Sequence, residues 1–296
     1  MPATPYVSAA AFRAHPTYLD TDGLLPDEPD PDVQTAELTS LLVQASAWAD
    51  NQCDQPLGAH LYTQNTRVRA DRVGMLRIHA DHKPVRSVTS FSYGSSPTSL
   101  TALASPQVWV EDDANMVFTV GGASTGWSGS LQVGFGASPG GEFFARVGIV
   151  AGYVATLTTA AATAGDTSLT VADPTGIEPG SRYTIWEPGR METVTVSPLW
   201  QPPAATTAPA PTSVLLAEPL ASDHAEGNDF SGLPGDARLA IVKYTIALLL
   251  RPDTSAEAEF PDSTTNSSTR GKDPRRTGLG YVDEARKILR SYQKVR

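Results

Sequence analysis

Cysteine is almost absent from this sequence, because Cys53 is the only one among its 296 residues. No intrachain disulfide can form, so a secreted module held together by disulfides is not expected. Residues 1–5 (MPATP) also lack the basic start and the apolar stretch of a signal peptide. We therefore expect the protein to fold in a reducing cytoplasm.

Long apolar runs are missing as well. The longest covers residues 239–250 and is interrupted by Lys243. It falls short of the ~18 to 20 residues that a helix needs to cross a bilayer. We expect no membrane span and no membrane partner.

Catalytic and ligand-binding signatures are equally sparse. Residues 79–82 (HADH) could offer two imidazoles and a carboxylate to zinc, but a polar turn at the end of a strand is the better interpretation. Ser128 is not in a Gly-x-Ser-x-Gly motif, and Pro139 replaces the third glycine of a dinucleotide-binding pattern in the stretch 134–141. We expect no enzyme, no cofactor and no metal site.

Positive charge is scarce except at the C-terminal end. Residues 270–296 contain nine Lys/Arg against three Asp/Glu, whereas residues 1–269 contain thirteen against twenty-nine. Seven of these carboxylates lie in residues 20–37, a run typical of a solvated arm. The acidic body is a poor surface for duplex nucleic acid, whose binding depends on cations that neutralise phosphates. The basic tail more plausibly binds an acidic protein partner.

Residues 1–30 lack periodic apolar positions, which predicts an extended N-terminal arm. Asp30 can then cap a helix, and Pro31 suits its first turn. Apolar residues follow at three- and four-residue spacing, so we expect a helix with one buried face. These residues are Leu38, Leu41, Leu42, Ala45, Trp48 and Ala49.

Between residues 61 and 134 the apolar period shortens to two, which predicts a β-rich section. The expected strands are 62–70, 75–79, 85–93, 107–111, 116–120 and 130–134. Residues 143–156 fit a short strand or a buried helix turn about equally. Together with the preceding helix, this section forms the first part of a core that covers residues 31–155.

Residues 156–232 differ in composition, being rich in Thr, Ala, Gly and Pro. Strands are expected at 168–171, 182–186, 191–196 and 213–216. Residues 187–190 (EPGR) suit a type II hairpin turn, since proline and glycine fit its two central positions. Residues 201–211 (QPPAATTAPAP) predict an exposed, semi-stiff loop. We interpret the region as a small inserted β module.

Two further helices are expected after Gly232. The first lies within residues 233–252 and has little polar face, so it should be buried on two sides. Residues 253–280 form a polar segment that has nothing to bury and should be mobile unless a partner orders it. The second helix, 281–296, is basic and has one narrow apolar seam. That seam consists of Tyr281, Ala285, Ile288, Tyr292 and Val295.

Four stretches in this order resemble the head-to-tail adaptor, or connector, family of tailed bacteriophages. They are the opening helix at 41–50 (LLVQASAWAD), the strand start at 83–91 (KPVRSVTSF), the apolar helix at 233–251 and the basic closing helix at 285–296. The insertion departs from the pattern, although 168–171, 174–176 and 224–227 are similar to a small β module of phage structural proteins.

The resemblance implies a virion protein of the phage neck, assembled in the host cytoplasm, with an α+β fold. That fold would have a helical core with a small antiparallel sheet, the inserted β-rich module and a C-terminal helix. The chain would form a dodecameric ring that binds the portal protein and a stopper or tail-completion protein. Packaged DNA would pass through the ring without sequence-specific binding, and the acidic body would help the genome slide.

Two sets of residues follow as hypotheses. A ring subunit needs lateral contacts, for which the apolar helix offers Leu239, Val242, Ile246, Leu249 and Leu250. Docking to the portal is assigned to Tyr281, Arg286, Ile288, Arg290, Tyr292, Lys294, Val295 and Arg296. Two alternatives remain open: another neck or tail structural protein, such as a stopper or a tail-end ring component, and a β-rich surface-binding protein.

Overall fold

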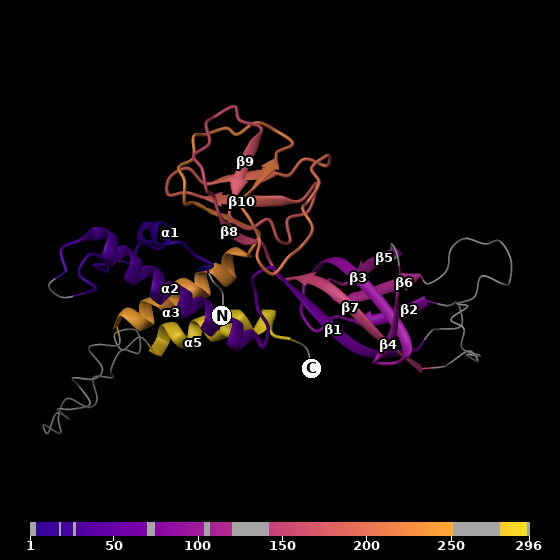
Figure 1. Cartoon of the computed structure of the whole chain (residues 1–296). Coiled ribbons are helices and arrows are strands. Elements are labelled where there is room, and N and C mark those ends of the chain that lie inside the picture. The colour runs from indigo at the N-terminus through magenta and orange to yellow at the C-terminus, as the bar shows by residue number, and fades with distance from the viewer. Residues whose placement is uncertain are drawn as a thin grey trace, which may run out of the picture.

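The computed structural model describes residues 4–17, 19–25, 28–69, 75–103, 107–119, 142–250 and 279–294. These residues form three hydrophobic cores: one among the helices, one between two layers of strands, and one inside a separate group of short strands. Figure 1 shows the three bodies, with the helices at the left, the layered strands at the right and the short strands above them.

The expectation of a helical core with a small antiparallel sheet is wrong. The described residues contain thirteen strands in four antiparallel sheets, but only four α-helices and one 3-10 turn. The ambiguous segment 143–156 explains much of the difference, because most of it is a ten-residue strand at the centre of the main sheet. The β-rich section is therefore a body with its own core and not an appendage of the helices.

The helical layer is built around a central helix. The helices are α1 (Ala9–Ala14), α2 (Pro31–Cys53), α3 (Gly235–Leu250), α5 (Leu279–Leu289) and the 3-10 turn η1 (Arg290–Tyr292). The predicted start of α2 is confirmed, since the Asp30 carboxylate accepts a bond from the Asp32 amide and Pro31 occupies the first turn. Helix α3 packs against both α2 and α5, while α1 lies on α2 (Figure 1).

The N-terminal arm is not entirely extended. It contains helix α1, capped by the Ser8 hydroxyl, which accepts a bond from the Ala11 amide. Tyr6, Val7 and Phe12 are buried in the same core as the other helices. The apolar residues of this arm were too few to show a period, but several of them pack in the helical core.

The layered body is a sandwich of two antiparallel sheets. The first has the order β1-β7-β3-β4 and the second the order β2-β6-β5. Between them, the aromatic rings of Phe91 and Phe118 stack with centroids 4.5 Å apart. The strands are β1 (His60–Arg69), β2 (Met75–His79), β3 (Val85–Ser96), β4 (Ser99–Ala102), β5 (Gln107–Glu111), β6 (Asn115–Thr119) and β7 (Glu142–Ala151). They confirm the predicted strands, except that 130–134 lies outside the described residues.

The third body is a small closed barrel. A four-stranded sheet, β11-β10-β13-β8, and a two-stranded sheet, β12-β9, are joined by bridges between Thr158 and Val171 and between Val196 and Leu216. These bridges close six strands into a ring around a filled apolar interior, which leaves no long unpaired edge. The strands are β8 (Ala155–Leu157), β9 (Ser168–Val171), β10 (Arg182–Trp186), β11 (Glu192–Thr195), β12 (Thr212–Leu215) and β13 (Asp229–Ser231).

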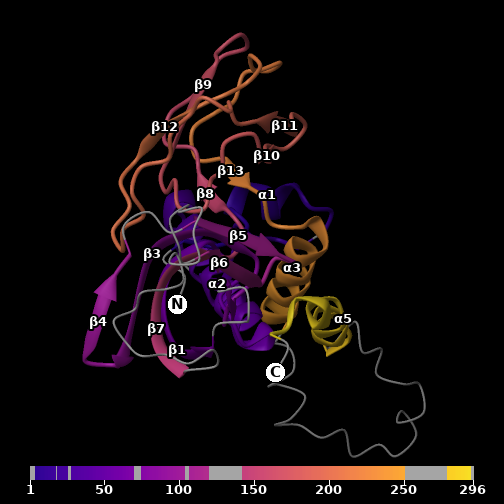
Figure 2. The same ribbon diagram turned by 90° about the vertical axis from the view of Figure 1, so that its right-hand side faces the viewer.

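The hairpin turn predicted at 187–190 is confirmed. Gly189 has a φ of +76°, and the Arg190 amide donates to the Glu187 carbonyl at 3.0 Å. Figure 2, turned by 90°, shows the barrel strands standing above the helical layer. None of the helices in the described part of the chain combines the length and apolar character that a bilayer crossing requires.

Candidate functional site

Segments far apart in the sequence meet where the helical layer joins the sandwich. Gln55, just after α2, donates to the Tyr292 carbonyl (2.8 Å), and its side-chain oxygen accepts from the Lys83 amide (3.0 Å). Lys294 pairs with Asp81 at 3.5 Å. The end of α2, the start of β3 and the C-terminal turn are thus fixed to one another. Lys83 and Tyr292 lie within two of the four stretches that carry the family resemblance, and Gln55 lies five residues after a third.

The fourth stretch, α3, joins the same body through its two flanking helices. The rings of Trp48 on α2 and Tyr244 on α3 are stacked with centroids 3.8 Å apart. At the other side, the Tyr292 hydroxyl donates to the Asp236 carboxylate at the start of α3, and Lys243 pairs with Glu284 of α5. Burial and the Asp236 charge both raise the pKa of Tyr292, so its hydroxyl remains a donor.

The residues assigned to a subunit interface lie largely in the core of their own chain. Val242 and Ile246 are buried, and Leu249 and Leu250 are half-buried against the same helical core. Leu239 is half-buried. Helix α3 is indeed covered on two sides, but its covers are α2 and α5 of the same molecule. It therefore leaves little apolar surface for a neighbouring copy.

The apolar seam of the C-terminal helix also faces inward. Of the predicted seam residues, Ala285 is buried, and Tyr281, Ile288 and Tyr292 are half-buried against the helical core. Val282 and Leu289, which were not predicted as seam residues, are buried in the same core. Docking this seam into a groove of another protein would first require α5 to leave α3. Of the other residues assigned to portal docking, Arg286 and Arg290 are exposed, Lys294 is half-buried, and Val295 and Arg296 lie outside the described residues.

A polar centre between the barrel and the helices was not predicted from the sequence. The Arg238 guanidinium on α3 pairs with Asp229 on β13 at 2.5 Å, and both side chains are almost fully buried. The Ser8 amide donates to Asp229 (3.0 Å), and Arg238 donates to the Tyr6 carbonyl (2.9 Å). The N-terminal segment is therefore held between β13 and α3. Its contacts with Asp229 and Arg238 join residues 221 and 232 positions apart.

A second part of the N-terminal segment is fixed by a buried carboxylate. The Tyr6 hydroxyl donates to Asp50 at 2.9 Å and accepts from the Gly58 amide at 2.9 Å, while the Leu57 amide donates to Asp50 at 2.8 Å. Burial raises the pKa of Asp50 to about 6 and also raises the pKa of Tyr6. A side chain at Gly58 would collide with the Tyr6 ring.

The histidine cluster at 79–82 is divided between two environments. The ring of His79 bonds to Asn115 at 3.0 Å, whereas His82 Nδ1 lies 2.8 Å from His60 Nε2. Because His60 Nδ1 faces the Gly58 carbonyl, it must carry a proton, and His82 then donates to His60 Nε2. No group of three or more potential metal ligands is found within the described ranges. Burial lowers the pKa of both His60 and His82.

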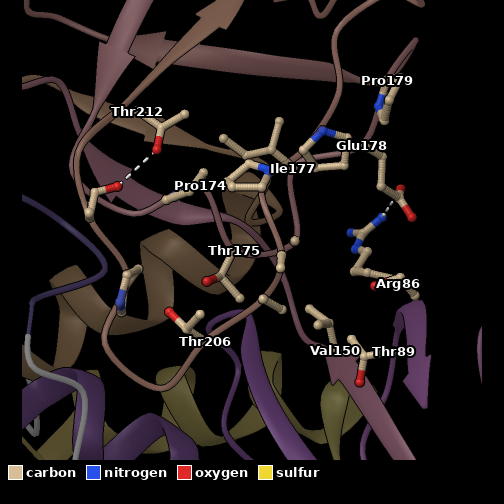
Figure 3. Close-up of a pocket in the computed structure, with 18 of the residues that line it drawn as sticks. Arg86, Thr89, Val150, Pro174, Thr175, Ile177, Glu178, Pro179, Thr206 and Thr212 are labelled. Atoms are coloured by element: carbon tan, nitrogen blue, oxygen red, sulfur yellow. Dashed lines mark hydrogen bonds and ion pairs between the residues drawn. The ribbon is translucent and has the colours of Figure 1, made fainter. Parts of the chain in front are cut away.

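A cavity of about 990 Å³ lies between the sandwich and the barrel (Figure 3). Its walls come from β3 and β7, from the barrel loop 174–181, and from the proline-rich loop 202–212. Among the described residues that line it, Arg86 and Glu178 are the charged ones, and they pair with each other at 3.3 Å. The remaining lining consists of hydroxyl, proline and small apolar residues, so the cavity offers a neutral binding surface and no histidine or cysteine for catalysis.

Ser128 and the stretch 134–141 lie outside the described residues. Comparison of the chain with protein-family models and with curated proteins finds no match. Three features of the structure bear on function: the junction at Gln55, the buried ion pair at Arg238 and the exposed cations at the end of α5.

Proposed function

We propose that this chain is a subunit of the head-to-tail adaptor ring of a tailed bacteriophage, which joins the portal to the tail and lets DNA pass. One observation carries the proposal. The four stretches that resemble the adaptor family lie close together in the fold. Gln55, five residues after the first stretch, binds Lys83 of the second and Tyr292 of the last, and Trp48 of the first stacks on Tyr244 of the third. A chance likeness of short apolar patterns would not require these stretches to meet.

The charge distribution supports passage of DNA without base readout. Residues 1–269 carry sixteen more carboxylates than cations, so most of the surface repels phosphate. Sequence-specific recognition would need cationic and amide side chains aimed at base edges from a helix or ribbon that enters a groove. The exposed cations Arg286 and Lys287 lie on α5, whose other face is packed against α3, and the exposed Arg290 follows in the adjoining turn η1. They are better suited to an acidic protein surface.

The proposal is tested by imaging the chain with portal rings of the phage that encodes it. Purified portal rings, with and without the full chain, would be compared by electron microscopy and two-dimensional classification. The expected result is an added ring of density coaxial with the portal on its tail-facing side. Portal rings that remain bare at saturating chain would overturn the proposal. Density instead on the end of a tail tube, or only on a preformed adaptor ring, would favour a tail-end ring component or a stopper.

A further inference from the structure

Helix α5 presents an exposed cationic face on a fixed support. Val282, Ala285 and Leu289 anchor the inner side of the helix in the core, while Lys287 and Arg290 point to solvent. Within the ranges that the structure describes, neither of these two cations has an ion-pair partner. The third cation, Arg286, lies 3.7 Å from Asp283, and both side chains are more than half exposed, so this pair holds it weakly.

A complementary acidic surface lies elsewhere on the same molecule. Between Arg13 and Arg67 the sequence contains no lysine or arginine. The loop before α2 and the first turn of that helix expose Asp20, Asp22, Asp30 and Asp32, together with the apolar side chain of Val33. Arg13 is the single cation that pairs with this group among the described residues, through Asp22 at 3.4 Å.

The two surfaces lie at opposite ends of α2. The acidic residues adjoin its start, whereas the cationic end of α5 meets its last residue, where the Cys53 thiol lies 3.8 Å from the Leu289 carbonyl. Because α2 has 23 residues, the two ends are about 30 Å apart. They cannot neutralise each other within one chain without unpacking the core. In two copies, however, one surface can meet the other without any change of fold.

We propose that the cationic face of α5 docks against the acidic α1–α2 surface of a second copy of this chain. This inference rests on the proposed ring, and it names the lateral contact. Since the two surfaces are different, the contact is head-to-tail, and each subunit can make it with the next. Such a series of contacts closes into a ring when the rotation between successive copies divides a full turn evenly. Because the apolar faces of α3 are packed within the chain, we expect the lateral contact to be made by these charged residues and not by Ile246 and its neighbours.

The test uses two charge reversals and their mixture. Lys287→Glu with Arg290→Glu reverses the cationic face, and Asp22→Lys with Asp32→Lys reverses the acidic one. Sedimentation velocity of the full chain at low and raised salt reports self-association. We expect wild-type association that weakens with salt, and a loss of roughly tenfold or more in affinity for each variant alone. An equimolar mixture of the two variants should associate again. The reversed α5 face of one variant then meets the reversed acidic surface of the other, and the two unaltered surfaces also meet as an opposite pair.

A matched control and a portal-binding measurement separate the outcomes. Arg182→Glu with Arg190→Glu makes the same change in net charge on the barrel, where both cations are exposed, and should associate like the wild type. A wild-type chain that stays monomeric at low salt, or a mixture that does not recover, would overturn the inference. If the α5 reversal abolishes portal binding but leaves self-association unchanged, the cationic face binds portal instead. Failure of the proposed function would appear separately, as bare portal rings with every variant.

Discussion

Arg238 and Asp229 form a buried ion pair that joins the barrel to the central helix. The guanidinium also lies over the Trp186 ring at 4.5 Å and donates to the Tyr6 carbonyl. Removing one member of such a pair leaves the other charge buried and unpaired, which costs about 3–5 kcal/mol. We therefore expect Arg238→Met to lower the free energy of unfolding by that amount in urea titrations.

The double variant Arg238→Met with Asp229→Asn provides the control for this prediction. Because neither charge remains, it should be clearly more stable than Arg238→Met alone. Arg86→Met removes a partly exposed partner of Glu178 and should cost no more than about 1 kcal/mol. Equal losses in the single and double variants would show that the charges themselves do not matter.

The buried carboxyl of Asp50 predicts a dependence of stability on pH. Its pKa is raised from 3.8 to about 6, mainly by burial, so the folded state holds its proton more tightly than the unfolded state. This contribution to stability is complete below pH 3.8 and is lost as pH rises through about 6, by up to about 3 kcal/mol. Asp50→Asn should remove this change. Parallel stability curves for the two proteins across that window would contradict the assignment.

The pair of His60 and His82 predicts the opposite sign. Burial lowers both pKa values below the ordinary histidine value of 6.5, so the folded state releases protons relative to the unfolded state. The resulting stability is present above pH 6.5 and is lost as the pH falls, since a second proton also breaks the bond between the two rings. His82→Asn keeps a donor and does not titrate. In the Asp50→Asn background it should lose less stability on acidification, measured by urea unfolding.

Local contacts were predictable from the sequence, and contacts across long separations were not. The cap at Asp30 acts on a residue two positions away, and the turn at Gly189 depends on one glycine in a four-residue window. By contrast, the Ser8 amide meets Asp229 from 221 positions away, and no local pattern specifies that pair. Strand β7 was ambiguous because residues 147–151, its second half, are all buried and show no alternation.

The same reasoning explains why an apolar helix face does not by itself identify a subunit interface. An apolar face on α3 indicates burial but does not distinguish the chain's own α2 and α5 from a second copy. Leu289 is fully buried in this core, so Leu289→Ala should destabilise the monomer by about 2–5 kcal/mol. Leu199→Ala, at a leucine that is 83% exposed, should change stability by less than about 0.5 kcal/mol. A folded, fully stable Leu289→Ala monomer would mean that α5 is not part of the core.

The barrel should be removable if the deletion spares Asp229. The Thr158 amide donates to the Asn228 carbonyl at 2.9 Å, so a short Gly/Ser bridge can replace residues 159–227 without moving β8 or β13. Phe230 points into the barrel core and would be exposed, so Phe230→Thr belongs in every deletion variant.

The shortened chain keeps the pair of Asp229 with Arg238 and should show one cooperative thermal transition. Adding Asp229→Asn should destabilise the shortened chain further, because Arg238 then lacks its charged partner. The loss should be smaller than the ~3–5 kcal/mol of a fully buried pair, since the deletion also removes Trp186, which covers the guanidinium in the full chain. Loss of cooperativity in the parent deletion would show that the barrel strands are needed by the rest of the fold.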